Sequence, residues 1–194
     1  MNPTKKPIDN LEDLATRARS GDSAAMKQLV TELKDDVYRF LVYLCKDPDV
    51  ASDLTQETFI RALTKITKLK DPKSCKSWIL SVAKNLFLDQ QRTQRSNEMV
   101  PLEDAVHLAA VEESTDTELK LEMLREALSH LDPSDRIVIV CVDLEGQSYA
   151  DAAVVVGVSE NALRSRLHRA RQRLLSAYEK VETKSSLTRR LYGT

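Results

Sequence analysis

The chain has 194 residues, of which 42% are hydrophobic and 30% charged, so it can form one ordinary domain or two small ones rather than a disordered chain. Its 4 glycines and 6 prolines are few, which argues against a turn-rich β-sheet protein and favours helices. No apolar stretch is long enough to cross a membrane and no apolar signal core follows the first lysines, so we expect a cytoplasmic protein without membrane insertion.

The N-terminal half shows three helical patterns in succession. In residues 22–45 the apolar side chains recur in steps of three and four, which predicts a long amphipathic helix. A second helix is predicted from Asp47, a capping residue followed by proline, and a third over residues 74–95. We expect these helices to form a small domain over residues 22–96, preceded by a segment over residues 1–21.

An acidic linker is predicted over residues 97–118, which hold seven acidic residues and no lysine or arginine. Helical periodicity resumes at residue 119 and predicts a second domain over residues 119–178, followed by a tail over residues 179–194. The β-branched run 137–142 resembles a strand, but the helical patterns around it favour a helix. The predicted fold is therefore all-α, with two small helical domains joined by an acidic flexible linker.

Residues 148–174 show the pattern of a helix-turn-helix. Ser148 can cap a short helix, Gly157 suits a turn with a positive φ angle, and Ser159 can cap the next helix. In that next helix one apolar face recurs in steps of four and three: Leu163, Leu167, Ala170 and Leu174. The pattern predicts that the second helix lies across the first and presents its other side to a partner.

That other side is rich in arginine. Arginine can donate two hydrogen bonds to guanine or neutralise phosphates, so such a helix suits the major groove of DNA. The alternative is an ordinary amphipathic helix with a solvated basic face. The candidate DNA contacts are Arg164, Ser165, His168, Arg169 and Arg171.

The charges are segregated along the chain. Residues 61–95 hold nine lysines and arginines against two acidic residues, and residues 160–173 hold five against one. Two basic blocks on either side of the acidic linker suggest two contacts with nucleic acid, although solvated helix faces give the same counts.

The helix-turn-helix over residues 131–174 resembles the promoter −35-binding region of extracytoplasmic-function (ECF) sigma factors, especially in the run RSRLHRARQRL. Residues 49–63 look like the helix of that family that binds core RNA polymerase. Residues 77–95 are similar to its −10 melting and recognition segment. The resemblance implies a sigma factor that binds core RNA polymerase and directs initiation at promoter DNA by recognising and melting promoter elements.

The resemblance assigns a docking role on the polymerase to one stretch of five matching residues. The face formed by its acidic and amide side chains suits a basic partner. Phe59 equally suits packing in the core. The matching residues are Asp53, Leu54, Gln56, Glu57 and Phe59.

The resemblance likewise implies that Trp78 and Asn85 act at the separated −10 strand and that Arg92 and Arg95 follow phosphates. Trp78 also continues an apolar stripe, which favours a place in the core. The −35 motif departs from the family's usual residues, since Asp151-Ala152-Ala153 stands where the family usually has Glu-Ile-Ala, so the DNA preference is open.

Other functions remain as alternatives. A stand-alone helix-turn-helix regulator would bind DNA without polymerase. An enzyme acting on nucleic acid is disfavoured: Asp35 and Asp36 are consecutive and point apart on a helix, and no phosphate loop or nucleophile motif is present. We therefore expect no enzymatic activity and no cofactor. The scattered cysteines Cys45, Cys75 and Cys141 predict no metal site, and the resemblance implies an anti-sigma factor as a further partner that no residue identifies.

Overall fold

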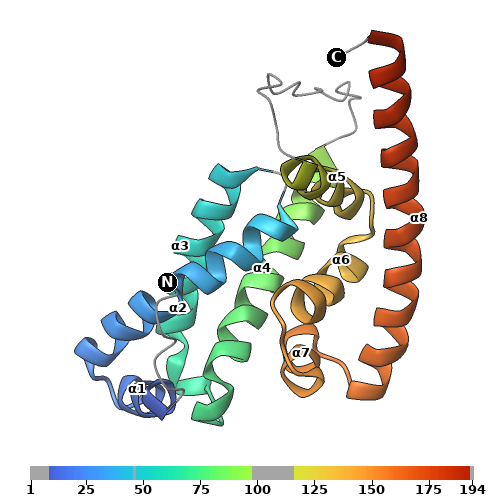
Figure 1. Cartoon of the computed structure of the whole chain (residues 1–194). Helices are drawn as coiled ribbons and strands as arrows, with labels where there is room; N and C mark the ends of the chain where they lie inside the picture. The colour runs from blue at the N-terminus through green and yellow to red at the C-terminus, as the bar shows by residue number, and fades with distance from the viewer. Residues whose placement is uncertain (1–8, 46, 98–115, 193–194) are drawn as a thin grey trace.

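The protein is described here by a computed structural model that places most of the chain (Figure 1). The described residues are 9–45, 47–97 and 116–192, and side chains are described for residues 11–45, 47–94 and 119–186. Throughout these ranges the chain forms helices joined by short turns, with no strand. The helices group into two domains, one from the N-terminal and one from the C-terminal half, so the predicted all-α class is confirmed.

Capping residues define where the helices of the N-terminal domain begin. The carboxylate of Asp22 accepts hydrogen bonds from the amides of Ala24 and Ala25 at 2.8 and 3.1 Å, which caps the second helix. Asp47 caps the third helix in the same way, with Pro48 in its first turn. The helices are α1 (Asp9–Arg19), α2 (Ser23–Leu44), α3 (Pro48–Thr64) and α4 (Cys75–Asn97), with two 3₁₀ turns, η1 (Ile66–Lys68) and η2 (Pro72–Ser74).

Helix α1 lies in the N-terminal segment for which the sequence predicted no structure. It packs on α2 and buries Leu14, Ala15 and Ala18. Two of these three residues are alanines, so the apolar stripe is short and weak in the sequence. The helix nevertheless covers one side of the hydrophobic core of the domain.

The C-terminal domain contains the predicted helix-turn-helix. The β-branched run is helical, as predicted, and ends in a π-helical turn; Ile137, Val138, Ile139 and Val140 are all buried. Burial on every side explains why this stretch has no polar face. The elements are α5 (Asp116–Ser129), α6 (Pro133–Ile139), η3 (Val140–Leu144), α7 (Tyr149–Val156) and α8 (Glu160–Tyr192).

Helix α8 is 33 residues long and continues well beyond the helix-turn-helix. Its extension carries Val181, which is buried against Met123 and Ala127 of α5 in a small separate cluster. The two helices therefore pack against each other, and α5 lies beside α8 on the side of the N-terminal domain (Figure 1).

The two domains share one hydrophobic core. The cluster of buried side chains runs without interruption from Leu14 of α1 to Leu167 of α8. Helix α4 lies in the middle of the molecule, where it contacts α2 and α3 on one side and α7 on the other (Figure 1).

Candidate DNA and polymerase interfaces

The local structure of the helix-turn-helix follows from three residues. The Ser148 hydroxyl accepts a hydrogen bond from the Asp151 amide at 3.1 Å and so caps α7. Gly157 ends α7 with a φ angle of 82°, a left-handed conformation in which other residues are strained. The Ser159 hydroxyl accepts from the Ala162 amide at 3.3 Å at the start of α8. All three sequence predictions are confirmed.

Helix α8 divides sharply into an inner and an outer face. Leu163, Leu167 and Ala170 are buried, as their spacing predicts. The outer face carries the candidate DNA contacts, all of them exposed: Arg164, Ser165, His168, Arg169 and Arg171. The domain therefore holds the helix by one face and offers the other to a partner.

Some outer side chains are held in place by neighbours. The guanidinium of Arg164 lies 4.2 Å from the centre of the Tyr149 ring and 3.6 Å from the Glu160 carboxylate. Tyr149 is a residue that the sequence analysis missed, because its distance to Arg164 depends on how α7 crosses α8. The side chain of His168 lies 3.3 Å from Gln172 on the same helix.

Arg171 is tied to the domain rather than free. Its guanidinium donates two hydrogen bonds to Asp143 of η3, at 2.5 and 3.0 Å. The hydrogen bond to Asp143 raises the pKa of Arg171 above its ordinary value. Arg169, in contrast, forms no hydrogen bond or ion pair with any residue that the structure describes. The two arginines therefore differ in how readily they can turn towards a phosphate or a base.

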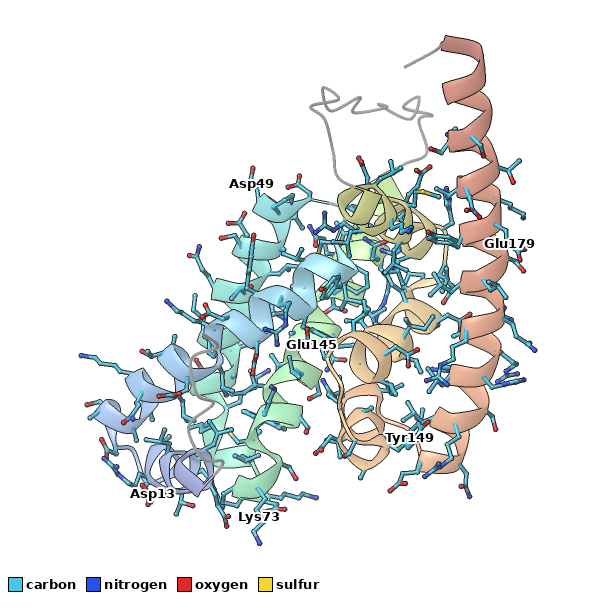
Figure 2. All side chains as sticks on the ribbon, in the orientation of Figure 1. Asp13, Asp49, Lys73, Glu145, Tyr149 and Glu179 are labelled. Carbon is cyan, nitrogen blue, oxygen red and sulfur yellow. The ribbon has the colours of Figure 1, made fainter. Side chains whose placement is uncertain are left out.

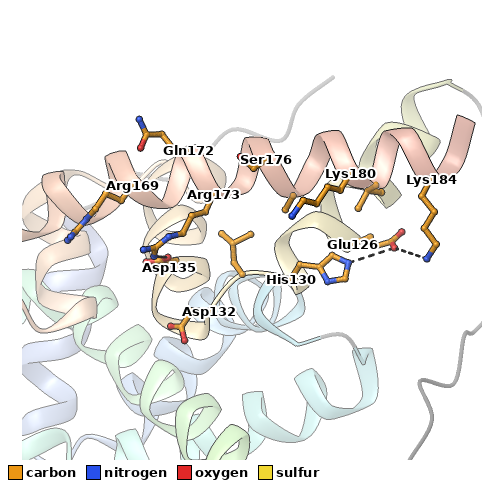
Figure 3. A pocket seen from close by; sticks show the side chains of 13 residues that line it. Glu126, His130, Asp132, Asp135, Arg169, Gln172, Arg173, Ser176, Lys180 and Lys184 are labelled. Atoms are coloured by element: carbon orange, nitrogen blue, oxygen red, sulfur yellow. Dashed lines mark hydrogen bonds and ion pairs between the residues drawn. The ribbon is translucent and has the colours of Figure 1, made fainter.

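A groove of about 1000 Å³ runs along α8 between that helix, α5 and α6 (Figure 3). Arg169 and Lys180 lie on its α8 wall, and the Glu126 carboxylate interacts with His130 and Lys184, each at 3.9 Å. Arg173 turns away from the row of candidate DNA contacts to pair with a buried aspartate, Asp135. The lining is of mixed charge: Asp135 is paired with Arg173, and Glu126 lies beside His130 and Lys184.

The candidate residues on α4 occupy different surroundings. Trp78 is half-buried and packs on the core, as its apolar stripe predicts, whereas Asn85 is exposed. Arg92 is exposed and lies 3.4 Å from the Asp89 carboxylate. The side chain of Arg95 lies outside the described residues. Helix α4 therefore brings an amide and a guanidinium to the surface and holds the indole partly inside.

The candidate docking residues on α3 separate into two groups. Asp53 and Gln56 are exposed, and Glu57 pairs with Arg61 one turn later at 2.6 Å. Phe59 is only 6% exposed and belongs to the core, which supports its packing interpretation. Leu54 is half-buried against the same core. The acidic and amide side chains thus form the outer surface, and the apolar ones anchor the helix.

Ile60 is a further surface residue that the sequence analysis did not single out. It is 63% exposed, which is unusual for a large aliphatic side chain, and it follows Gln56 and Glu57 by one helical turn. Its spacing from those two residues is visible in the sequence. Exposure was the missing information, because an aliphatic residue in a helix is normally assigned to the core.

The described residues offer no cluster of side chains that could bind a metal ion. They contain no group of three His, Cys, Asp or Glu side chains that could hold a metal ion. Burial raises the pKa of Cys45 and of Cys75 to about 11, and of Cys141 to about 12, so these thiols are protonated at neutral pH. In the same described ranges no helix is both long and apolar enough to span a bilayer.

Comparison with known families accounts for both halves of the molecule. Residues 29–97 match the Sigma-70 region 2 family, and residues 121–174 match the Sigma-70 region 4 family. The first match covers α3 and α4, and the second covers the helix-turn-helix. A stand-alone regulator is not favoured, since the match to region 2 extends to the N-terminal domain.

Individual relatives give the same assignment. The ECF RNA polymerase sigma factor SigE of Mycolicibacterium smegmatis is 33% identical over 87% of this chain and 68% of its own length. SigC of Mycobacterium tuberculosis, also an ECF RNA polymerase sigma factor, is 32% identical over 92% of this chain and 97% of its own length.

Two solved structures are similar in fold and sequence. CnrH in complex with the cytosolic domain of CnrY has a TM-score of 0.68 and 25% identity, covering 89% of this chain and 99% of that one. The sigma factor RpoE in complex with the anti-sigma factor NepR from Bartonella quintana has a TM-score of 0.64 and 27% identity, covering 79% and 96%. The chain therefore belongs to the ECF sigma factors, which bind core RNA polymerase and direct promoter-specific initiation of transcription.

Proposed function

We propose that the three surfaces described above divide the work of this sigma factor. The α3 surface formed by Asp53, Gln56 and Glu57 docks on core RNA polymerase. Helix α4 acts at the −10 element through Trp78 and Asn85, with Arg92 and Arg95 following the backbone. The outer face of α8 reads the −35 element through Arg164, Ser165, His168, Arg169 and Arg171. No step requires catalysis by the chain itself, and the protein acts in the cytoplasm.

The two faces of α8 carry this proposal. The inner face fixes the helix on the domain while the outer face presents arginines at a spacing that suits a groove of DNA. The charges of the other surfaces support the same division. An exposed carboxylate and amide on α3 suit a basic protein partner, and the exposed Asn85 suits unpaired bases.

An anti-sigma factor is part of the proposal. Both solved structures reported above are complexes, one of CnrH with the cytosolic domain of CnrY and one of the sigma factor RpoE with the anti-sigma factor NepR. We infer that this chain is held by a comparable protein, and its identity is left to experiment.

Binding to core polymerase is the first experiment. The protein is mixed with bacterial core RNA polymerase and followed by size-exclusion chromatography at two salt concentrations. We expect stable co-elution, and we expect Asp53→Lys combined with Glu57→Lys to abolish it because two carboxylates facing a basic surface are reversed. Arg125→Glu is the matched control, since Arg125 is an exposed cation on α5, outside all three surfaces.

The assignment of α8 has its own readout. In the holoenzyme, Arg164→Ala and Arg169→Ala should each weaken binding to −35 DNA, by about 1–3 kcal/mol where the arginine pairs with a base, while leaving core binding unchanged. Loss of core binding by these variants, or unchanged DNA affinity, would show that the outer face of α8 has another role.

A further inference from the structure

The arginines on the outer face of α8 differ in whether their hydrogen-bond donors are already used. Arg171 donates two hydrogen bonds to Asp143. Arg164 also has two neighbours, but neither takes up a donor. Its guanidinium lies over a tyrosine ring, and the Glu160 carboxylate is 3.6 Å away, beyond the length of a hydrogen bond. Arg164 is therefore held by contacts while it forms no hydrogen bond with any residue that the structure describes.

Tyr149, which provides this ring, is itself fixed by the fold. It is the first residue of α7 and directly follows the capping residue Ser148. Its side chain is half-buried and packs against the hydrophobic core, where α7 meets the first turns of α8 (Figure 2). The Cζ atom of Arg164 lies 4.2 Å from the ring centre, well within the range of a cation–π contact. A long and otherwise flexible side chain thus rests on a fixed support.

The ring orders Arg164 more effectively than the carboxylate does. The side chains of Glu160 and Arg164 are both about half exposed, and an exposed ion pair of this kind is weakened by water and salt. Contact of a guanidinium with an aromatic face combines electrostatic attraction with packing of two flat groups. We therefore attribute the orientation of Arg164 mainly to Tyr149.

An ordered arginine suits the recognition of a guanine. A guanidinium recognises guanine through two N–H groups, which donate to the O6 and N7 atoms of the base. A cation–π contact takes up no donor, so both N–H groups remain available. A flexible arginine loses side-chain freedom when it binds in a single geometry, and this loss is smaller when the side chain is already ordered. An ordered Arg164 should therefore favour the two-bond contact with a base over a looser contact with a phosphate.

Tyr149 also influences the second arginine of the same row. Arg171 follows Arg164 by two helical turns, or about 10 Å along the axis of α8. The hydrogen bond to Asp143 makes the largest contribution to the raised pKa of Arg171, and the hydroxyl of Tyr149 adds to it. One side chain of α7 thus acts on two candidate DNA contacts of α8, with its ring on the first and its hydroxyl on the second.

We propose that Tyr149 is a positioning residue for −35 recognition, whose ring orients the guanidinium of Arg164 for a two-bond contact with a guanine. Arg164 is the group that reads the base, and Tyr149 acts through it. The inference deepens the proposed role of α8 and rests on that role. It predicts that loss of the ring lowers discrimination between bases, and that this effect requires Arg164.

Base discrimination by the holoenzyme is the direct test. Binding is measured on promoter duplexes in which each −35 base pair is changed in turn, and Arg164→Ala identifies the pair that Arg164 reads. Tyr149→Leu should lower the preference for guanine at that pair by roughly two- to fivefold, the factor that an exposed cation–π contact supports. Tyr149→Phe keeps the ring and should retain the wild-type preference.

Tyr178→Leu is the matched control. Tyr178 is another half-buried tyrosine of the same domain, and it packs beside α5, well beyond Arg164 along α8. The same substitution there should leave the base preference unchanged, which separates the effect of Tyr149 from a general loosening of the domain. Thermal unfolding followed by circular dichroism checks that each variant is folded. If Tyr149→Leu unfolds early, Tyr149→Met replaces it, since methionine fills the site with a flexible apolar side chain.

A double-mutant cycle distinguishes positioning from direct contact with DNA. In the Arg164→Ala background, Tyr149→Leu should cause no further loss of affinity or discrimination, because the group that it positions is absent. An equal loss in both backgrounds would mean that Tyr149 touches DNA itself or only supports the fold. Either meaning would overturn the inference.

The free protein offers a readout that needs neither polymerase nor DNA. In NMR spectra of arginine-labelled protein, the ring should shift the side-chain protons of Arg164 upfield. The shift should vanish in Tyr149→Leu and persist in Tyr149→Phe, and identical spectra of the wild type and Tyr149→Leu would overturn the ordering of Arg164. If the spectra show the contact but Arg164→Ala binds −35 DNA as the wild type does, the proposed function of α8 fails at Arg164 while the contact itself stands.

Discussion

The outer face of α8 and the surroundings of α4 use the same kinds of side chain in opposite ways. On α8 the arginines stand at the surface, and Arg169 has no partner among the described residues. Around α4 the polar groups of Ser77, Lys84 and the neighbouring Arg136 are turned inward and hydrogen-bonded across a domain boundary. Arg169 on α8 is thus available to a ligand, whereas the polar side chains beside α4 already contribute to the fold.

This difference decides what a mutation measures. A substitution of an unpaired residue on the outer face of α8, such as Arg169, removes a contact that exists only in the complex, so it should change DNA binding and leave stability alone. A substitution at the domain boundary removes a contact of the free protein, so stability changes first. The two kinds of substitution are therefore distinguished by measuring stability and DNA binding on the same variants.

The largest expected effect is on Arg136. Arg136→Met keeps much of the side-chain volume but leaves the carbonyls of Leu44, Ser129 and Leu131 without their buried donor. We expect the free energy of unfolding to fall by about 3 kcal/mol, because each buried carbonyl left unpaired costs about 1–3 kcal/mol and some regain water. Chemical denaturation followed by circular dichroism measures the loss.

The matched control for Arg136 is Arg125→Met, which removes an exposed arginine of α5. Its unfolding midpoint should stay close to that of the wild type. Equal midpoints for both variants would mean that the buried guanidinium adds nothing to stability, and the contrast between the two regions would be lost.

Trp78 and Asn85 test the contrast within a single helix. Trp78→Ala should lower the free energy of unfolding by about 2 kcal/mol, less than a fully buried aromatic would, because the indole is only half-buried against the core. Asn85→Ala should leave stability unchanged and reduce opening of the −10 region in the holoenzyme, measured by permanganate reactivity of thymines. If the Asn85→Ala variant opens the −10 region as well as the wild type does, Asn85 does not belong to the −10 surface.

The helices were largely predictable from the sequence because their signals are local. Asp47 and Ser148 each cap a helix at the predicted position, and Gly157 adopts the positive φ angle that its place in the turn requires. Helix α1 was missed because Leu14 and two alanines give a weak stripe. Local patterns predict what depends on residues within a few positions of one another.

The partners of the site residues were not predictable, because they come from distant parts of the chain. Arg171 meets Asp143, 28 positions away, and Arg39 meets Glu145, 106 positions away. The spacing within α8 predicts that Arg171 faces outward. It contains no information about the contact of Arg171 with Asp143 of η3. For the same reason the packing of α4 against α7 could not be predicted from the periodicity.

Gly157 gives a smaller effect, confined to the turn of the helix-turn-helix. No atom lies within 4 Å of an added Cβ, so Gly157→Ala creates no clash and leaves only the strain of a φ angle of 82°. We expect a loss of about 1 kcal/mol in the free energy of unfolding. Gly157→Asn should lose less, since asparagine tolerates the left-handed region better than alanine does. A more stable alanine variant would contradict the assigned turn conformation.

Arg171 and Arg169 provide the smallest and sharpest comparison, because they lie two positions apart on one helix. Arg171→Ala breaks the paired hydrogen bonds to Asp143 and should cost about 0.5 kcal/mol of stability, a modest figure because the arginine is half-exposed. Arg169→Ala should cost nothing measurable. In DNA binding by the holoenzyme the order should reverse, with the larger loss for Arg169. Arg171 must first release Asp143 to reach DNA, so its net contribution to affinity is reduced by the pair that it gives up.

Asp143→Asn weakens that pair without touching α8, and it should raise DNA affinity if Arg171 is held back in this way. A lower affinity for Asp143→Asn would instead mean that the pair positions Arg171 for its DNA contact. The hydrogen bonds to Asp143 would then support DNA binding by Arg171 rather than compete with it.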